Sequence, residues 1–261
     1  MTEPVGIVVP AYRPDVGVLT EYVAALTDRI GPETIRIELD APADGVREQL
    51  ADLPATVNTV DARRGKGAAI TAGFEALETE TLAFVDADGS TPAPEVGRIV
   101  ATPLEDPVDL AVGSRRHPDA TVTTTQSPVR ESLGDGFAWL ARRCLEVQLY
   151  DYQCGAKAIT AEGWQQVRRE LTEPGFAWDI ELLAVASAVG LRVQEVPIEW
   201  HDHPESTVAP VRTSIQLASA LVRARQRARR RDASALQRVL NRVVDSQQSL
   251  VERNVPPQDD D

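Results

Sequence analysis

Lysine is nearly absent from this sequence of 261 residues: Lys66 and Lys157 are the only two among 27 basic residues, and the others are arginine. Acidic residues number 40 and are spread along the chain, which gives a formal net charge of −13. A surface this acidic disfavours non-specific binding of nucleic acid. Its self-repulsion is best screened in high salt, where the Debye length falls to roughly 3 Å. The composition therefore indicates a halophilic source with a saline cytoplasm.

Cysteine and long apolar runs are also scarce. Cys144 and Cys154 are the only cysteines, and two cysteines ten residues apart form neither a disulfide framework nor a metal-ligand spacing. The sequence has no run of 18 or more apolar residues, which argues against a membrane-spanning helix. Its first twelve residues, MTEPVGIVVPAY, lack the charged start and long apolar run of a signal peptide. We therefore expect a cytoplasmic protein.

Short apolar, β-branched runs alternate with amphipathic stretches along most of the chain. Strands are predicted over 5–10, 34–40, 55–60, 81–89, 109–114 and 191–200. Helices are predicted over 15–30, 65–78, 94–101, 130–148, 162–171 and 179–189. Because most of these strands are apolar throughout rather than alternating, they indicate an α/β protein with a mostly parallel sheet covered on both faces. Ligands bind such sheets at the carboxyl ends of the strands, where Asp40, Asp86 and Asp88 fall.

Two carboxylates separated by one residue, Asp86 and Asp88, directly follow an apolar strand. There they can converge on one hard cation such as Mg²⁺ or Mn²⁺, which is held by one or two carboxylates together with phosphate oxygens. The metal would offset the charge that builds on a departing diphosphate. An isolated Asp-x-Asp pair more often marks a solvated turn, so this interpretation depends on the strand before it and on the neighbouring motifs.

Gly65 and Gly67 flank Lys66 at the predicted start of a helix. Free backbone N–H groups and the positive end of the helix dipole favour phosphate at such a position, and Lys66 adds a point charge. The segment does not match the G-x-x-x-x-G-K-[ST] pattern of a P-loop. An ordinary glycine-rich turn is the alternative. In a chain with only two lysines, however, the retained residue favours a position that needs a compact ammonium group.

The order of these motifs resembles that of family 2 glycosyltransferases. Over residues 5–207 the sequence has VVPAY, Asp40, RRGKGAAITAG, DADGST, VGSRR, DYQCGAKAI, FAWDIELL and VPIEW. Within this family it resembles the branch that makes dolichyl-phosphate glucose or mannose, of haloarchaeal type, and DADGST with D-x-Q-C-G-x-K looks more like the glucosyltransferases than the mannose synthases. The resemblance implies a GT-A fold, a Mg²⁺ or Mn²⁺ ion, a UDP- or GDP-sugar donor and inversion at the anomeric carbon.

The resemblance also implies roles for individual residues. Those implied for the nucleotide-sugar donor are Pro10, Ala11, Tyr12, Asp40, Lys66, Asp86, Asp88 and Arg115. Asp88 would be the principal metal ligand, with Asp86 on metal or ribose and Asp40 on the base. Those implied for the acceptor are Arg130, Gln153 and Lys157. The sequence departs from the family at Asp40-Ala-Pro-Ala-Asp44, where Asp-Asp-Gly-Ser is usual, and it lacks the C-terminal transmembrane helices of some branches.

Catalytic roles are implied for Asp179, Glu181 and Arg130. The two carboxylates are two residues apart on a predicted helix and do not face each other, so we expect Asp179, at the helix start, to point into the site. For an alcohol acceptor such a group would be the general base. For a phosphate acceptor, whose oxygen is already anionic, positioning and charge stabilisation suffice. A helix cap beside a solvated glutamate is the alternative. Either His201 or His203, after the last strand, could complete a metal shell.

The chain is predicted to comprise a glycosyltransferase domain over 1–209, a helical appendage over 210–253 and an acidic disordered tail over 254–261. Residues 223–231, RARQRARRR, hold six arginines after a moderately amphipathic stretch. A basic amphipathic helix suits an anionic membrane surface, which predicts peripheral contact through 211–231 on the inner face of the cell membrane. A helix that neutralises its own acidic domain and a nucleic-acid-binding arm are the alternatives.

The favoured function is transfer of a hexose from a UDP- or GDP-sugar to dolichyl or polyprenyl phosphate at the cytoplasmic membrane face, with no nucleic-acid partner. Two alternatives remain at this point: the same donor chemistry with a saccharide acceptor, and a nucleotide-sugar-binding module without turnover. A nucleotidyltransferase would need a glycine-rich phosphate loop directly after the first strand, where this chain has PAYRPD.

Overall fold

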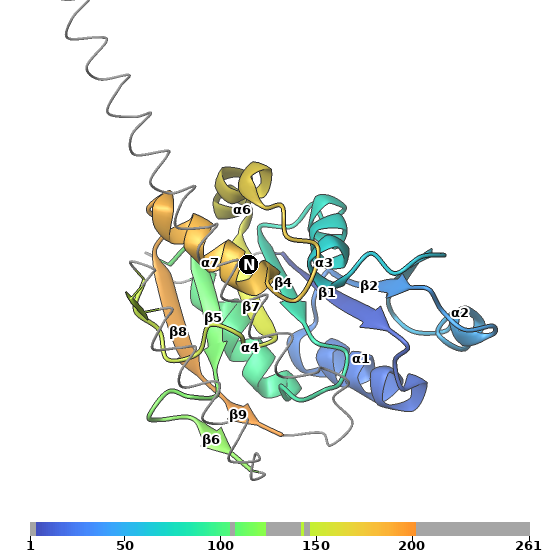
Figure 1. Cartoon of the computed structure of the whole chain (residues 1–261). Helices are drawn as coiled ribbons and strands as arrows, with labels where there is room; N and C mark the ends of the chain where they lie inside the picture. Colours follow the sequence, from blue (N-terminus) through green and yellow to red (C-terminus); the bar gives the residue numbers. More distant parts are fainter. Residues whose placement is uncertain (1–3, 105–107, 124–141, 144–146, 202–261) are drawn as a thin grey trace, which may run out of the picture.

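A seven-stranded β-sheet forms the centre of the protein (Figure 1). The computed structural model describes residues 4–104, 108–123, 142–143 and 147–201. In the sheet order β3-β2-β1-β4-β7-β5-β8, β7 runs antiparallel to β4 and β5, and the other neighbours are parallel. The strands are β1 (Val5–Tyr12), β2 (Thr34–Asp40), β3 (Thr56–Val60), β4 (Thr81–Val85), β5 (Leu110–Ser114), β7 (Ala156–Thr160) and β8 (Val193–Pro197).

Helices cover both faces of this sheet. One face packs against α1 (Val16–Ile30) and α4 (Ala93–Ala101), and the other packs against α3 (Lys66–Glu75), α6 (Ala161–Val167) and α7 (Trp178–Ala188). The short helix α2 (Val46–Gln49) and the 3₁₀ turns η1 (Thr102–Leu104) and η2 (Arg168–Glu170) lie in connections. A second sheet pairs β6 (Thr121–Val122) with β9 (Glu199–Trp200) in parallel.

The central strands are buried on both faces, which explains their unbroken apolar sequences. Every residue of β4 and of β5 is buried, as expected for strands sandwiched between helices. The predicted α/β class and mostly parallel sheet are therefore confirmed. The strand predicted over 81–89 ends at Val85, because the backbone turns away from the ladder after the N–H of Asp86 donates to the carbonyl of Gly155 at 2.8 Å.

Most predicted helices appear within one to three residues of their expected bounds. Helix α1 begins where the Asp15 side chain accepts a hydrogen bond from the Val18 N–H at 3.0 Å, and it ends at Gly31 with φ of 60°. These are the usual N-cap and left-handed C-terminal arrangements. Of the helix predicted over 130–148, residues 142–143 are helical and 147–148 are not. Its other residues, with 210–253 and 254–261, lie outside the described residues.

Helix α7 is buried over almost its whole surface, from Trp178 to Ala186. Its apolar residues fill the core between α3, α6 and the sheet. Two of the buried residues are acidic, Asp179 and Glu181. A buried carboxylate is costly unless it is paired or hydrogen-bonded, so the partners of these two side chains indicate what each does.

Candidate active site

The predicted acidic residues lie at one edge of the sheet, where β1, β2 and β4 end (Figure 1). Tyr12 and Asp40 are register partners at the last positions of β1 and β2. Asp86 and Asp88 follow β4, which pairs with β1 in parallel. Because parallel strands end at a common edge, Tyr12, Asp40, Asp86 and Asp88 lie at the same edge of the sheet.

The turn after β4 holds its two aspartates in different environments. Asp88 is exposed, and its Oδ1 accepts a hydrogen bond from the Ser90 N–H at 2.9 Å. The Asp86 side chain is 40% exposed and packs so closely on Gly155 that a Cβ atom there would overlap the carboxylate. Gly89 adopts φ of 69°, a left-handed conformation that glycine accommodates without strain.

Tyr22 of α1 packs against this turn and supports it, a role that was not predicted from the sequence. A Cβ atom on Gly89 would lie 3.7 Å from the Tyr22 ring, so the ring is next to this glycine. The Tyr22 hydroxyl donates to the Thr91 carbonyl at 2.7 Å. Burial, with the charges of Asp88 and Asp86, raises the pKa of Tyr22 well above its usual value. The tyrosine therefore stays neutral and can serve as a hydrogen-bond donor.

Four charged residues from four elements form a connected network beside the turn. The Lys66 ammonium lies 2.8 Å from Asp86 Oδ1 and 3.3 Å from Asp179 Oδ2. The Lys157 ammonium lies 2.6 Å from Asp179 Oδ1 and donates to the Cys154 carbonyl at 2.7 Å. Asp179 therefore lies between two ammonium groups, and its role in an active site stays a prediction. The two lysines of the chain meet at one carboxylate.

These contacts shift the pKa values of the network. Burial acts to raise the pKa of Asp179, but the charges of Lys157 and Lys66 outweigh it, so this pKa lies below its usual value. Burial acts to lower the pKa of Lys66, and the charges of Asp179 and Asp86 raise it above its usual value. Burial raises the pKa of Asp86, Lys66 opposes this rise and Asp88 adds to it. A strongly paired, ionised Asp179 is a weak proton acceptor.

Lys157 has only 1% of its side chain exposed. It lies under the site, on β7, with its ammonium committed to Asp179 and a backbone carbonyl. This position does not match the acceptor-binding role expected from the resemblance, because a ligand cannot reach the ammonium without displacing both partners. Gln153 is half-buried, and its N–H donates to Asp151 Oδ1 at 3.0 Å.

Glu181 supports a loop instead of facing the site. Its carboxylate accepts from the Thr172 N–H at 2.7 Å, the Thr172 hydroxyl at 3.0 Å and the Glu173 N–H at 2.6 Å. The next carbonyl, of Pro174, accepts from the Ala68 N–H at 3.0 Å in the first turn of α3. The structure thus corrects the predicted catalytic role: Glu181 holds the loop that packs against the helix carrying Lys66.

The glycines around Lys66 are required by this close packing. A Cβ atom on Gly65 would lie 2.5 Å from the Pro174 carbonyl oxygen, and one on Gly67 would lie 2.5 Å from that of Glu173. Gly65 also adopts φ of 101°, where side chains are strained. The two glycines therefore allow the loop to lie directly on the start of α3, which buries Lys66 to 10% exposure.

Asp40 clamps the other end of the same glycine loop. Its carboxylate accepts from the Arg64 N–H at 2.7 Å, the Arg64 Nε at 2.7 Å and the Gly65 N–H at 3.0 Å. The Arg64 guanidinium also donates through Nη2 to buried Glu38 at 2.8 Å. Asp40 is 2% exposed, so its described role is to fix this loop on β2. Its contact with a nucleotide base stays a prediction.

Of Pro10, Ala11 and Tyr12, which the resemblance places on the donor, Tyr12 is the exposed one, at 37%. The guanidinium of Arg63 lies 4.1 Å from the centre of its ring and that of Arg13 lies 5.3 Å away, both within cation–π range. Pro10 is half-buried. Ala11 points its methyl group into the core, so only its backbone is available to a nucleotide.

Arg115 is held by an acidic partner that the sequence analysis did not assign. Its guanidinium makes two hydrogen bonds to Asp151, at 2.7 and 3.0 Å, and lies 5.3 Å from the Trp200 ring centre. Burial acts to raise the pKa of Asp151, but Arg115 lowers it to about 2. Glu195 in turn accepts from the Asp151 N–H at 2.7 Å. Arg115 thus pairs with a buried carboxylate near the site. Arg130 lies outside the described residues.

The chain after β9 returns to the acidic turn. The His201 N–H donates to the Ser90 carbonyl at 3.0 Å, while its ring lies 3.0 Å from the Glu199 carboxylate. Among the described residues no group of three or more His, Cys, Asp or Glu side chains converges on one point. This part of the protein therefore offers an ion two carboxylates, Asp86 and Asp88. His203 lies outside the described residues.

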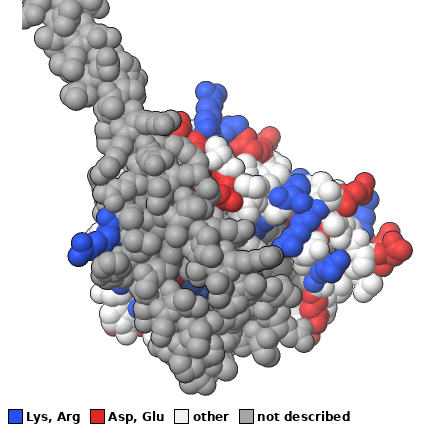
Figure 2. All heavy atoms as spheres, in the orientation of Figure 1, with Lys and Arg blue, Asp and Glu red and all other residues white. Residues whose placement is uncertain are grey.

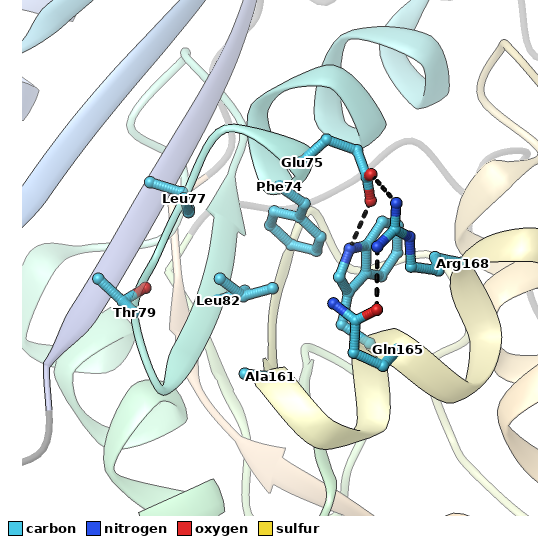
Figure 3. A pocket seen from close by; sticks show the side chains of 9 residues that line it. Phe74, Glu75, Leu77, Thr79, Leu82, Ala161, Gln165 and Arg168 are labelled. Carbon is cyan, nitrogen blue, oxygen red and sulfur yellow. Dashed lines mark hydrogen bonds and ion pairs between the residues drawn. The ribbon is translucent and has the colours of Figure 1, made fainter.

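A small cavity lies elsewhere, between α3 and α6 (Figure 3). It measures about 80 Å³ and reaches Leu82, near the start of β4 and far along the strand from Asp86. Glu75 at its rim accepts from Trp164 Nε1 at 2.9 Å and pairs with Arg168. Figure 2 shows basic and acidic side chains interspersed on the visible described surface. Neither feature competes with the sheet edge as the candidate site.

Sequence comparison assigns the chain to a family. A family model described as glycosyl transferase family 2 matches residues 6–172, which is more than half of the chain. The chain therefore belongs to glycosyl transferase family 2. The match spans β1 to the loop before α7 and includes Lys66, Asp86 and Asp88.

Among curated proteins, the chain is similar to glycosyltransferases of archaea and eukaryotes. Glycosyltransferase AglD of Haloferax volcanii is 31% identical over 163 residues, which cover 62% of this chain and 26% of that protein. Dolichyl-phosphate beta-glucosyltransferase of Mus musculus is 29% identical over 171 residues, covering 64% of this chain and 53% of the relative. The Saccharomyces cerevisiae enzyme is 30% identical over 170 residues, covering 61% and 51%. The chain spans about half the length, or less, of these relatives.

Solved structures share the architecture. Glucosyl-3-phosphoglycerate synthase from Mycobacterium tuberculosis, in complex with UDP, superimposes with a TM-score of 0.65 at 17% identity over 86% of this chain and 80% of that chain. Its complex with Mn²⁺, UDP and glucosyl-3-phosphoglycerate gives 0.66 at 15% identity, covering 85% and 80%. This likeness identifies the fold as GT-A, as expected from the sequence. In the part of the chain that the structure describes, no helix is long and apolar enough to cross a bilayer.

Proposed function

We propose that this protein is an inverting glycosyltransferase that moves a hexose from a UDP- or GDP-sugar to dolichyl or polyprenyl phosphate. The observation that carries the proposal is the pair Asp86 and Asp88 at the end of β4, with the Lys66 ammonium 2.8 Å from Asp86. The family assignment supports glycosyl transfer, and the dolichyl-phosphate beta-glucosyltransferase relatives support the acceptor.

The two aspartates fit a Mg²⁺ or Mn²⁺ ion. Asp88 is exposed, and Asp86 has one oxygen, Oδ2, outside its ion pair with Lys66. Mg²⁺ in proteins is usually bound by one or two carboxylates, and phosphate oxygens and water supply its remaining ligands. When bound there, the ion would stabilise charge on the leaving nucleoside diphosphate. Asp88 is the principal ligand in this proposal because its carboxylate is exposed and, within the described part of the chain, accepts from the Ser90 N–H instead of pairing with a cation.

The protein's own residues would orient the donor and stabilise its charge. Lys66 lies beside the metal carboxylates at the first turn of α3, where its ammonium favours a diphosphate. Tyr12 offers an exposed ring for the nucleotide at the adjacent strand end. The loop held by Glu181 fixes α3 relative to α7, so that Lys66 is positioned before the donor arrives.

The environment of Asp179 favours a phosphate acceptor over an alcohol. An alcohol must lose a proton to a general base during transfer. Asp179 is the carboxylate that the sequence offers for this task, yet it is 4% exposed and paired with two lysines that keep its pKa low. A phosphate oxygen is already anionic and needs no base, which makes dolichyl or polyprenyl phosphate the better match. We place the reaction at the cytoplasmic membrane face, with peripheral contact through 211–231.

The test uses the full chain in high-salt buffer with Mg²⁺ or Mn²⁺. Radiolabelled UDP-glucose or GDP-mannose is incubated with dolichyl phosphate, and the organic phase is then extracted. We expect an organic-soluble, acid-labile product with phosphorylated lipid and none with dolichol. Label that moves only to water-soluble saccharides would contradict the lipid acceptor. Binding of the nucleotide sugar without transfer of label to any acceptor would instead support the alternative, a nucleotide-sugar-binding module without turnover.

A further inference from the structure

The four residues Lys157, Asp179, Lys66 and Asp86 form a line of alternating charge from the core to the surface. Their side-chain exposures rise along it, from 1% through 4% and 10% to 40%. They come from β7, α7, α3 and the turn after β4, which meet at one end of the sheet (Figure 1). The line therefore connects a fully buried lysine with a carboxylate of the metal turn.

Both ammonium groups lie against the same buried ring. Phe84 of β4 is the cross-strand partner of Lys157, and its ring centre is 5.6 Å from the Lys157 ammonium and 5.3 Å from that of Lys66. Phe84 is fully buried and meets Trp178 edge to face, with ring centroids 5.6 Å apart. Both ammonium groups thus lie beside one ring, with Asp179 paired to each of them and Asp86 paired to Lys66 alone.

The distances show how the charges are shared. Asp179 lies 2.6 Å from Lys157 but 3.3 Å from Lys66, whereas Lys66 lies 2.8 Å from Asp86. Lys157 thus provides most of the charge that Asp179 needs. Lys66 consequently remains available to Asp86, where it occupies Oδ1, one of the oxygens that a metal ion would use.

We propose that Lys157 and Asp179 are positioning residues that set the availability of Asp86 by dividing the Lys66 ammonium between Asp86 and Asp179. The inference rests on the proposed function, because it takes Asp86 and Asp88 as the metal carboxylates. Loss of Lys157 leaves Lys66 as the sole cation on Asp179, which draws it away from Asp86 and frees that carboxylate. Loss of Asp179 has the reverse effect, because Lys66 then pairs with Asp86 alone.

The experiment measures Mn²⁺ affinity without nucleotide, by electron paramagnetic resonance of free Mn²⁺ during titration of the full chain. We expect Lys157→Met to tighten Mn²⁺ binding and Asp179→Asn to weaken it, each by about two- to fivefold, the range expected for a partly exposed ion pair. Lys66→Met should also tighten Mn²⁺ binding. Calorimetry with UDP and Mn²⁺ should then show weaker UDP binding in Lys157→Met and Lys66→Met, because the ammonium no longer reaches the diphosphate.

The double variant Lys157→Met/Asp179→Asn separates this model from a simple field effect. It removes one positive and one negative charge, so a long-range Coulombic effect predicts wild-type Mn²⁺ affinity. The division of Lys66 predicts affinity as weak as in Asp179→Asn, because Lys66 has only Asp86 left. This variant also avoids the cost of an unpaired buried charge, so it stays informative if Lys157→Met does not fold. A matched control is Arg192→Met, which breaks the peripheral pair with Asp109 and should leave Mn²⁺ affinity unchanged.

Two outcomes overturn the inference in different ways. Wild-type affinity in the double variant, or shifts of the same sign in both single variants, refutes the division of Lys66 while leaving the metal site intact. Wild-type protein that binds no Mn²⁺ even with UDP contradicts the metal site itself, and the proposed function and this inference then fail together.

Discussion

Gly155 gives the sharpest stereochemical test of the metal turn. A Cβ atom at this position would overlap the carboxylate of Asp86, with even the farther oxygen, Oδ1, only 3.0 Å away. Ordinary contacts of Cβ atoms begin at 3.4 Å, so in Gly155→Ala the carboxylate has to move. The Asp86 side chain is 40% exposed, so it can rotate towards solvent instead of disrupting the core.

We expect Gly155→Ala to lower activity far more than stability. A misplacement of ~1 Å in a reacting group costs about 10²-fold in rate, which corresponds to about 2.7 kcal/mol of transition-state stabilisation. The residue has no left-handed φ, so the free energy of unfolding should change by less than ~1 kcal/mol. The assay compares kcat/KM for lipid-linked product, and its Mn²⁺ dependence, with the midpoint of urea unfolding.

Gly97→Ala is the matched control. It adds the same methyl group in helix α4, where the nearest atom, on Ile30, lies 3.8 Å away. Replacement of a helix-interior glycine by alanine stabilises by roughly 0.5–1 kcal/mol, and kcat/KM should not change. Wild-type kcat/KM and Mn²⁺ dependence in Gly155→Ala would refute the reasoning, because the position of Asp86 would then be irrelevant to turnover.

Asp88→Asn should abolish turnover and leave the thermal unfolding midpoint unchanged, because the side chain is exposed and lies in a turn; retained turnover would exclude the metal mechanism. Glu181→Gln should destabilise the protein by ~1–3 kcal/mol in urea unfolding, because the anionic acceptor for the N–H groups of Thr172 and Glu173 is lost. The pKa of Asp151 falls from 3.8 to about 2 on folding, so its stabilising contribution is full above pH 3.8 and disappears as pH falls through about 2. Arg115→Met should lower the free energy of unfolding by ~3–5 kcal/mol at pH 7 and remove this pH dependence. Unfolding curves of Arg115→Met that match those of the wild type from pH 2 to 5 would contradict the role given to this ion pair.

Local sequence was sufficient for the part of the fold that local burial determines. Strands buried on both faces have unbroken apolar sequences, so β2 was predicted over its observed bounds, 34–40, and β4 from its first residue. Asp40, Asp86 and Asp88 were predicted together because parallel strands end at one edge. No strand was predicted at β7 (Ala156–Thr160), and its antiparallel direction depends on pairing with β4 and β5 rather than on a local sequence pattern.

The site residues that sequence reasoning misassigned are those whose partners come from distant segments. A catalytic role was implied for Glu181 as well as for Asp179, yet the Glu181 carboxylate meets the loop at 172–173 whereas Asp179 meets two lysines. Tyr22 carries no motif, and its role follows from the packing of α1 under Gly89. Lys157 lies within a family motif, which favoured a ligand contact, although its burial makes it part of the support.

The scarcity of lysine was the sequence feature that favoured a special position for Lys66, and the structure gives a physical reason why lysine is retained at residues 66 and 157. Lys157 fits between the Phe84 ring, the Cys154 carbonyl and Asp179 at 1% exposure. Such a space suits a compact ammonium on a flexible stem, whereas the planar five-donor fork of arginine would leave several donors buried without acceptors. Lys66 meets the same restriction between Asp86 and Asp179. In a chain that otherwise relies on arginine, lysine thus appears where a buried carboxylate must be matched by a point charge, and both such places belong to one network.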